Sequence, residues 1–108
     1  MFRLLTYVKS NKGANMLKTI TTKDEAKALT LKAAQKFVGG WVEGVTFPNN
    51  DYLIINEEGK MKKLPLNKEA TELWRKHFTK ETHINGYDDF IVGNAIIIKS
   101  EARTSGGW

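Results

Sequence analysis

The segment 89–99 constrains the fold more than any other part of this sequence, because it is apolar on consecutive positions. Neighbouring residues of a β-strand point to opposite faces of a sheet, so an unbroken apolar run predicts burial on both faces. We therefore expect 89–99 to form a central strand that is covered on both sides. Its apolar residues are Phe90, Ile91, Val92, Ala95, Ile96, Ile97 and Ile98.

Further strands are predicted from short runs of β-branched, aromatic and large aliphatic residues between turn-forming residues. Residues 2–8 and 16–22 are expected to form one hairpin. Residues 41–47 and 52–56 are expected to form a second, joined by the four-residue loop Pro48-Asn49-Asn50-Asp51. If Phe47 faces Tyr52 in that hairpin, then Val45 pairs with Ile54. A short edge strand is predicted at 61–66, which contains Pro65.

Two helices are predicted from capping residues and apolar spacing. The first ends at Gly39 and has two alternative starts: Thr22, which has Glu25 at capping-box spacing, and Thr30, which would begin a shorter helix over 31–38. Asn67 is a good N-cap for the second helix, over about 68–78.

These elements predict one α+β domain over residues 1–104, followed by a flexible tail at 105–108. The sheet is expected to be mainly antiparallel, with five to six strands and two helices. Two short helices cover one face of such a sheet, while several strands are apolar on both faces. We therefore expect the sheet to curve into a partial barrel or to place its second face against another chain.

The residues offer few groups for catalysis. The sequence has no cysteine, and its two histidines, His77 and His83, have no metal-binding spacing. The carboxylate pairs Glu57-Glu58 and Asp88-Asp89 are adjacent in sequence, so an extended chain would point their members apart. Phosphate-binding glycine motifs and nucleophile motifs are also missing. We expect a protein that is not an enzyme and has no catalytic, cofactor-binding or metal-binding residues.

The charge distribution suggests an anionic partner. The 108 residues carry 17 Lys and Arg against 12 Asp and Glu, and three of the cations are arginine. Eight of the cations lie in residues 1–40, beside only Asp24 and Glu25. A basic surface attracts nucleic acid, but lysine-rich surfaces also serve solubility alone. Neither a signal peptide nor a membrane span is predicted, so we expect a cytoplasmic protein that does not bind membranes.

A candidate nucleic-acid site combines lysines with aromatic side chains from the neighbouring strands. Lysines neutralise phosphates, and exposed aromatic rings stack on bases. The alternative is that the aromatic residues belong to the core and the lysines protect a strand edge. The candidate residues are Lys60, Lys62, Lys63, Trp41 and Tyr52.

From Leu31 to Ile98 the sequence resembles a small domain family of unknown function that is common in phages and bacterial mobile elements. The resemblance is carried by QKFVGGWVE at 35–43, NEEGK at 56–60, LPLN at 64–67 with Ala70-Thr71, and DFIVGN at 89–94. It provides no catalytic residues. It implies a viral or mobile-element accessory protein that acts in the host cytoplasm by binding and modulating a host protein or by self-association.

Overall fold

A computed structural model describes residues 15–78 and 89–108, and within them four strands form one mixed sheet. The strands are β1 (Leu17–Ile20), β2 (Val42–Thr46), β3 (Tyr52–Asn56) and β4 (Ala95–Ile98), in the order β1-β4-β3-β2. β1 pairs with β4 in parallel, and the other two pairs are antiparallel. The predicted strand at 2–8 lies outside the described residues.

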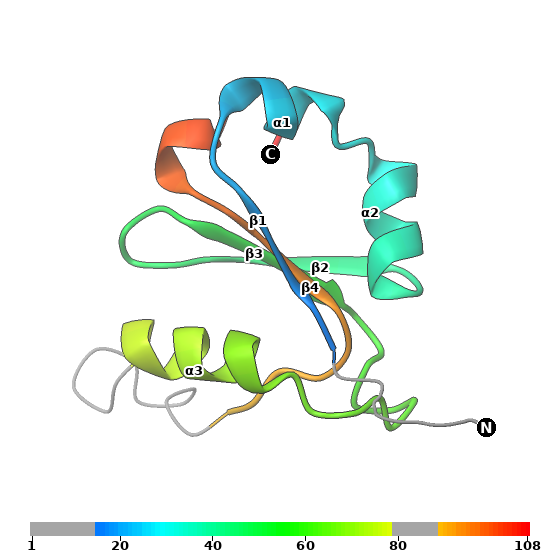
Figure 1. The fold of residues 1–108 in the computed structure, drawn as a ribbon. Helices are drawn as coiled ribbons and strands as arrows, with labels where there is room; N and C mark the ends of the chain where they lie inside the picture. Colours follow the sequence, from blue (N-terminus) through cyan, green and yellow to red (C-terminus); the bar gives the residue numbers. More distant parts are fainter. Residues whose placement is uncertain (1–14, 79–88) are drawn as a thin grey trace.

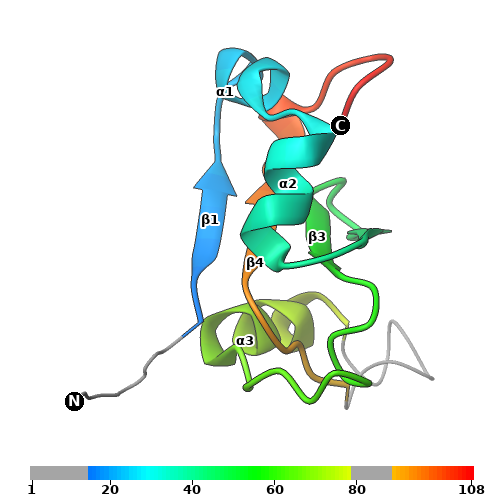
Figure 2. The ribbon, with the colours of Figure 1, turned by 90° about the vertical axis from the view of Figure 1, so that its right-hand side faces the viewer.

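Helices cover both faces of this sheet. α1 (Lys23–Ala28) and α2 (Leu31–Val38) lie on one face, and α3 (Lys68–His77) lies on the other (Figures 1 and 2). A 3₁₀ turn follows β4 at Ser100–Ala102. The described part of the chain is therefore an α+β domain, as predicted, but it has three helices, fewer strands than the five to six expected, a mixed sheet in place of a mainly antiparallel one, and no barrel closure.

β4 has the two-sided burial that the sequence predicted, and all four of its residues are buried. Ile96 and Ile98 pack in a core under α1 and α2, while Ala95 and Ile97 pack in a second core under α3. The strand is shorter than predicted, because residues 89–94 contribute only one isolated bridge, from Val92 to Leu66. The chain's own helices therefore cover both cores, and the sheet does not close into a barrel.

The extra helix arises because both candidate caps are used. The Thr22 side chain accepts from the Glu25 amide and completes a capping box at the start of α1. The Thr30 hydroxyl accepts from the Ala33 amide at the start of α2, and the extended Leu29 separates the two helices. Gly39 ends α2 with a left-handed φ of 87°. Thr22 and Thr30 therefore begin two consecutive helices and are not alternative starts of a single helix.

The β2–β3 hairpin differs from the prediction by one residue. Thr46, not Phe47, lies opposite Tyr52, and Val45 lies opposite Leu53. The cause is a tighter loop: the Phe47 amide donates to the Asp51 carbonyl, the Asn50 amide donates to the Phe47 carbonyl, and Asn50 takes a φ of 74°. A three-residue loop that ends in a left-handed residue is a common hairpin connection. The shift moves one strand's side chains to the opposite face relative to the other.

The strand predicted at 61–66 is wrong, because residues 57–63 form a wide turn in which Lys63 has a φ of 57°.

The segment 105–108, which was predicted to be a flexible tail, contacts the rest of the described structure through Trp108. The Trp108 indole donates to the Leu29 carbonyl at 2.7 Å, and its ring lies 6.4 Å from that of Tyr52. Among the described helices, none has the length and hydropathy required to span a bilayer.

Candidate binding surface

The wide turn 57–63 is held against the end of α2 by the buried side chain of Asn56. Its Nδ2 donates to the Val38 carbonyl at 3.1 Å, and its Oδ1 accepts from the Glu58 amide at 2.8 Å. The Glu57 amide donates to the Trp41 carbonyl at 2.8 Å, which extends the β2–β3 ladder by one bond. These bonds fix the positions from which the side chains of the turn reach the surface.

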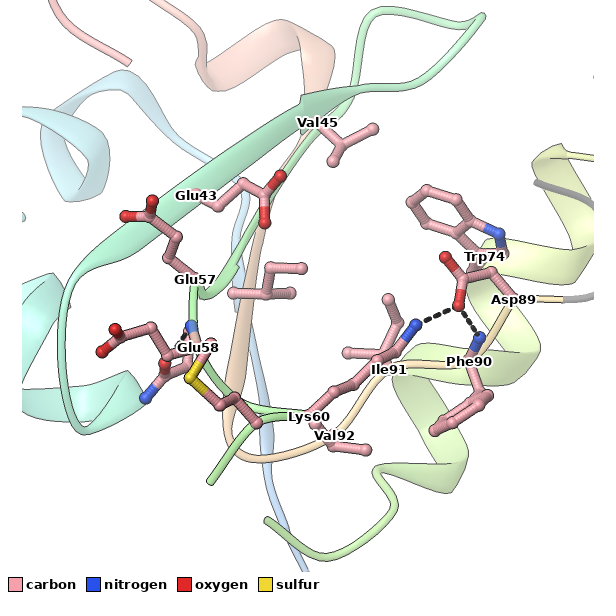
Figure 3. Close-up of a pocket in the computed structure, with 13 residues that line it drawn as sticks. Glu43, Val45, Glu57, Glu58, Lys60, Trp74, Asp89, Phe90, Ile91 and Val92 are labelled. Atoms are coloured by element: carbon pink, nitrogen blue, oxygen red, sulfur yellow. Dashed lines mark hydrogen bonds and ion pairs between the residues drawn. The ribbon is translucent and has the colours of Figure 1, made fainter. Parts of the chain in front are cut away.

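A groove of about 330 Å³ lies between this turn, the β2–β3 strands and the segment before β4 (Figure 3). Its inner wall is apolar and comes mainly from Val45, Ile55, Trp74, Ile91 and Val92. In Figure 3, Glu43, Glu57 and Glu58 lie along one side of the groove, and Lys60 and Asp89 lie on the other. The groove thus combines an apolar wall with a rim that carries four carboxylates and one ammonium group.

Lys60 and Asp89 form an ion pair on the rim of the groove, although 29 positions separate them in sequence. The Lys60 ammonium also lies 4.5 Å from the centre of the Phe90 ring. Burial alone would raise the pKa of Asp89, but hydrogen bonds from Lys60 and from the Phe90 amide hold it below its usual value. Both side chains are about half exposed, so the pair contributes little to stability.

A second, shallower depression of about 290 Å³ adjoins the groove and shares Glu58 with it. It is lined by Gln35, Gly40, Trp41 and Lys62 as well. Trp41 is 66% exposed, and Lys62 forms an ion pair with Glu58 at 3.6 Å. We call the groove, this depression and the side chains around them the binding surface.

The binding surface contains most of the residues predicted as a nucleic-acid site. Trp41, Lys60 and Lys62 line it, and Lys63 is exposed on the same turn. Tyr52 does not belong to it: its ring packs against the core under α1 and α2, with the Arg103 guanidinium 4.6 Å from the ring centre. Tyr52 faces away because of the hairpin register described above.

Sequence reasoning missed the acidic residues that accompany these lysines. Glu58 and Lys62 are four positions apart in one turn, so their pairing had a local signal. Asp89 had none, because only the fold brings it to Lys60. The carboxylates neutralise two of the three predicted phosphate-binding lysines, and this weakens the case for nucleic acid at this surface.

Side chains suited to binding a metal ion do not gather in residues 15–78 and 89–108. No cluster of three or more His, Cys, Asp or Glu side chains could hold a metal ion there. The His77 ring packs 4.8 Å from the Phe47 ring, and burial lowers its pKa. His83 and Asp88 lie outside the described residues.

The four segments that carry the family resemblance lie together around the binding surface. The segment 64–67 joins the segment 89–94 through hydrogen bonds from Gly93 to Pro65 and from Asn67 to Ile91, both 2.8 Å. Lys60 of 56–60 pairs with Asp89, and Trp41 of 35–43 accepts from Glu57. Gly59 fits because it has no side chain, since a Cβ there would lie 2.9 Å from Val92.

Comparison with known proteins gives one match. A family model described as "Domain of unknown function (DUF3846)" matches residues 7–106. Neither a curated protein nor a solved structure matches the chain.

Proposed function

We propose that this chain, which belongs to the DUF3846 family of domains of unknown function, is a non-enzymatic binding protein that holds a protein partner at the binding surface. One observation carries the proposal. Of the six large apolar side chains that are exposed in the described residues, Trp41, Met61 and Phe90 lie at the groove or the adjoining depression.

Exposed apolar side chains around a concave surface are typical of protein interaction sites. Trp41 is 66% exposed and Met61 is 79% exposed, so a partner would remove much apolar area from water. Tryptophan is also among the residues whose truncation costs most at protein interfaces. The rigid strands β2 and β3 beneath the groove hold the surface in a fixed shape, which lowers the entropic cost of binding.

The charges at this surface favour a protein over a nucleic acid. Glu43, Glu57, Glu58 and Asp89 line the groove beside a single lysine, Lys60. A phosphate backbone laid across the groove would meet more carboxylates than ammonium groups, and the binding of nucleic acid depends on the reverse. We also propose, as the family resemblance implies, that the chain is a phage or mobile-element accessory protein. Its partner would then be a host protein in the host cytoplasm.

Selection from a random linear peptide library tests this proposal without a known partner. We expect the enriched peptides to bind the Trp41→Ala variant about tenfold more weakly than the unmodified protein, measured by fluorescence anisotropy. Leu31→Ala is the matched control, because Leu31 is 54% exposed on α2 and lies outside the binding surface. Peptides that bind Trp41→Ala as tightly as the unmodified protein, or no enrichment at all, would refute the proposal.

A second candidate function is nucleic-acid binding by the side of the molecule that carries α1 and α2. There the lysines at 23 and 27 on α1, and at 32 and 36 on α2, are all exposed and are spaced one helical turn apart within each helix. If this function holds, affinity for DNA or RNA should fall steeply as salt is raised, and Lys32→Glu with Lys36→Glu should weaken it. Equal affinity of this double variant, or no binding at low salt, would exclude it.

A further inference from the structure

We infer that the groove recognises a partner segment in which a large apolar side chain is accompanied by an arginine or, less well, a lysine. This inference rests on the proposed function and adds the chemistry of the partner. It is carried by the apolar wall of the groove, by two carboxylates that form no ion pair within the described residues, and by an exposed aromatic ring that already contacts a cation.

The wall of the groove provides the apolar half of this recognition. Val45 and Ile55 come from the adjacent strands β2 and β3, and Trp74 comes from α3. The volume of about 330 Å³ lies at the lower end of the range for small-ligand sites, which begins near 300 Å³. A site of this size suits one anchoring side chain of a peptide, and the apolar wall favours an aliphatic or aromatic one.

The carboxylates of Glu43 and Glu57 provide the polar half. In the described residues, neither forms an ion pair, whereas Glu58 pairs with Lys62 and Asp89 pairs with Lys60. Glu43 lies opposite Ile55, and Glu57 follows Ile55 by two positions, so the register places both glutamates diagonally on one face. Diagonal neighbours in a hairpin lie about 7–8 Å apart, where two like charges repel. A cation bound between them would relieve that repulsion.

Arginine fits this rim better than lysine. Its planar guanidinium can donate two parallel hydrogen bonds to a carboxylate and can also lie flat on an aromatic ring. Phe90, which is 42% exposed at the groove, already has the Lys60 ammonium 4.5 Å from its ring centre. The ring therefore lies where a cation is well accommodated. The apolar stem of an arginine would also cover part of the groove wall.

The test uses the peptides selected on the unmodified protein and their matched analogues. We expect the enriched sequences to carry arginine or lysine beside a large apolar residue. Replacement of that arginine by citrulline, which keeps the shape and removes the charge, should weaken binding about tenfold. The double variant Glu43→Gln with Glu57→Gln should weaken the arginine peptides by a similar factor and leave the citrulline peptides unchanged. Glu69→Gln with Glu72→Gln, on the exposed side of α3, is the matched control.

The outcomes separate this inference from the proposed function. Some peptides could require Trp41 and yet bind equally well when citrulline replaces arginine, or bind the Glu43→Gln, Glu57→Gln variant as tightly as the unmodified protein. Either result would refute the cation requirement and leave the proposed binding function standing. Enrichment of acidic peptides would refute it as well. If the unmodified protein sediments as a dimer and the double variant sediments as a monomer, the groove binds a second copy of the chain. That result would overturn the inferred peptide segment. If no selected peptide depends on Trp41, both proposals fail.

Discussion

Replacement of Asn67 by alanine should lower the free energy of unfolding by about 3 kcal/mol, because one buried amide satisfies three backbone groups. Its Oδ1 accepts from the Ala70 amide at 3.0 Å and caps α3. Its Nδ2 donates to the Gly93 carbonyl at 2.8 Å and to the Met16 carbonyl at 3.1 Å. Alanine would remove the partner of the Ala70 amide and of the Gly93 carbonyl at a site that is 1% exposed, whereas the Met16 carbonyl would keep its bond from the Ala95 amide at 2.9 Å. Urea denaturation followed by circular dichroism measures the change.

Two further variants separate the roles of Asn67. Asn67→Ser keeps an oxygen that can cap α3 and should recover about 1 kcal/mol of the loss. Thr30→Ala removes only the cap of α2 and should cost about 1 kcal/mol. If Asn67→Ala cost no more than Thr30→Ala, the bonds from Asn67 to the segments before β1 and β4 would contribute nothing to stability.

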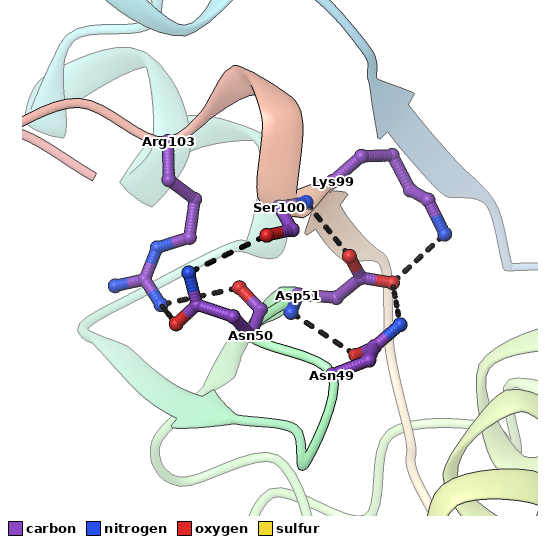
Figure 4. A network of polar contacts seen from close by, with 6 residues as sticks. All are labelled: Asn49, Asn50, Asp51, Lys99, Ser100 and Arg103. Carbon is purple, nitrogen blue, oxygen red and sulfur yellow. Dashed lines mark hydrogen bonds and ion pairs between the residues drawn. The ribbon is translucent and has the colours of Figure 1, made fainter.

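Replacement of Asp51 by alanine should also cost about 3 kcal/mol near neutral pH, since it breaks a buried and fully bonded carboxylate network. The carboxylate accepts from the Ser100 amide at 2.7 Å, from Lys99 Nζ at 2.8 Å and from Asn49 Nδ2 at 2.9 Å (Figure 4). The side chain of Asp51 is 2% exposed, whereas that of Lys99 is 35% exposed. Asp51→Asn keeps the volume and one acceptor and should cost less.

The effect of Asp51→Ala should depend on pH in a defined direction. Burial alone would raise the pKa of Asp51, but the hydrogen bonds from Lys99, Asn49 and Ser100 outweigh it and lower the pKa. In the unfolded chain the pKa of an aspartate is about 3.9, so acid protonates the unfolded state first. The stability that Asp51 provides is therefore complete above about pH 4 and is lost as the pH falls toward its folded value.

Urea denaturation of the unmodified protein and of Asp51→Ala, repeated at several acidic pH values, tests this pH dependence. The difference in unfolding free energy between the two proteins should shrink as the pH falls below about 4. The comparison with the alanine variant isolates Asp51 from the carboxylates of Glu25 and Asp89, whose pKa values are also lowered. A difference that stays constant down to the lowest pH would show that this carboxylate is not bonded as described.

Features that depend on neighbouring residues could be predicted from the sequence. The capping residues Thr22, Thr30 and Asn67 all start helices, and Gly39 ends one, because a cap is decided within a few residues. The two-sided burial of β4 followed from its own apolar run. Local chemistry thus located the helices and the strand that lies between the two cores.

Features that depend on rare backbone conformations, or on contacts between residues far apart in sequence, could not be predicted. The β2–β3 register rests on the left-handed backbone of Asn50, and nothing in the Asn49-Asn50 pair indicates which residue adopts it. A short strand is predicted at 61–66, but Lys63 turns the chain there with a left-handed backbone. The parallel pairing of β1 with β4 and the pairing of Lys60 with Asp89 both bring together residues that have no local relation.

The position of β4 in the sheet affects how this chain folds during its synthesis. β4 hydrogen-bonds to β1 on one side and to β3 on the other, yet it is the last strand of the sheet to leave the ribosome. Until Ala95–Ile98 emerges, the edges of β1 and β3 that it will pair with stay open, and neither core can close. Contacts between residues so far apart in sequence slow folding and leave strand edges exposed to other chains. The nascent chain therefore remains vulnerable to aggregation until Ala95–Ile98 has left the ribosome.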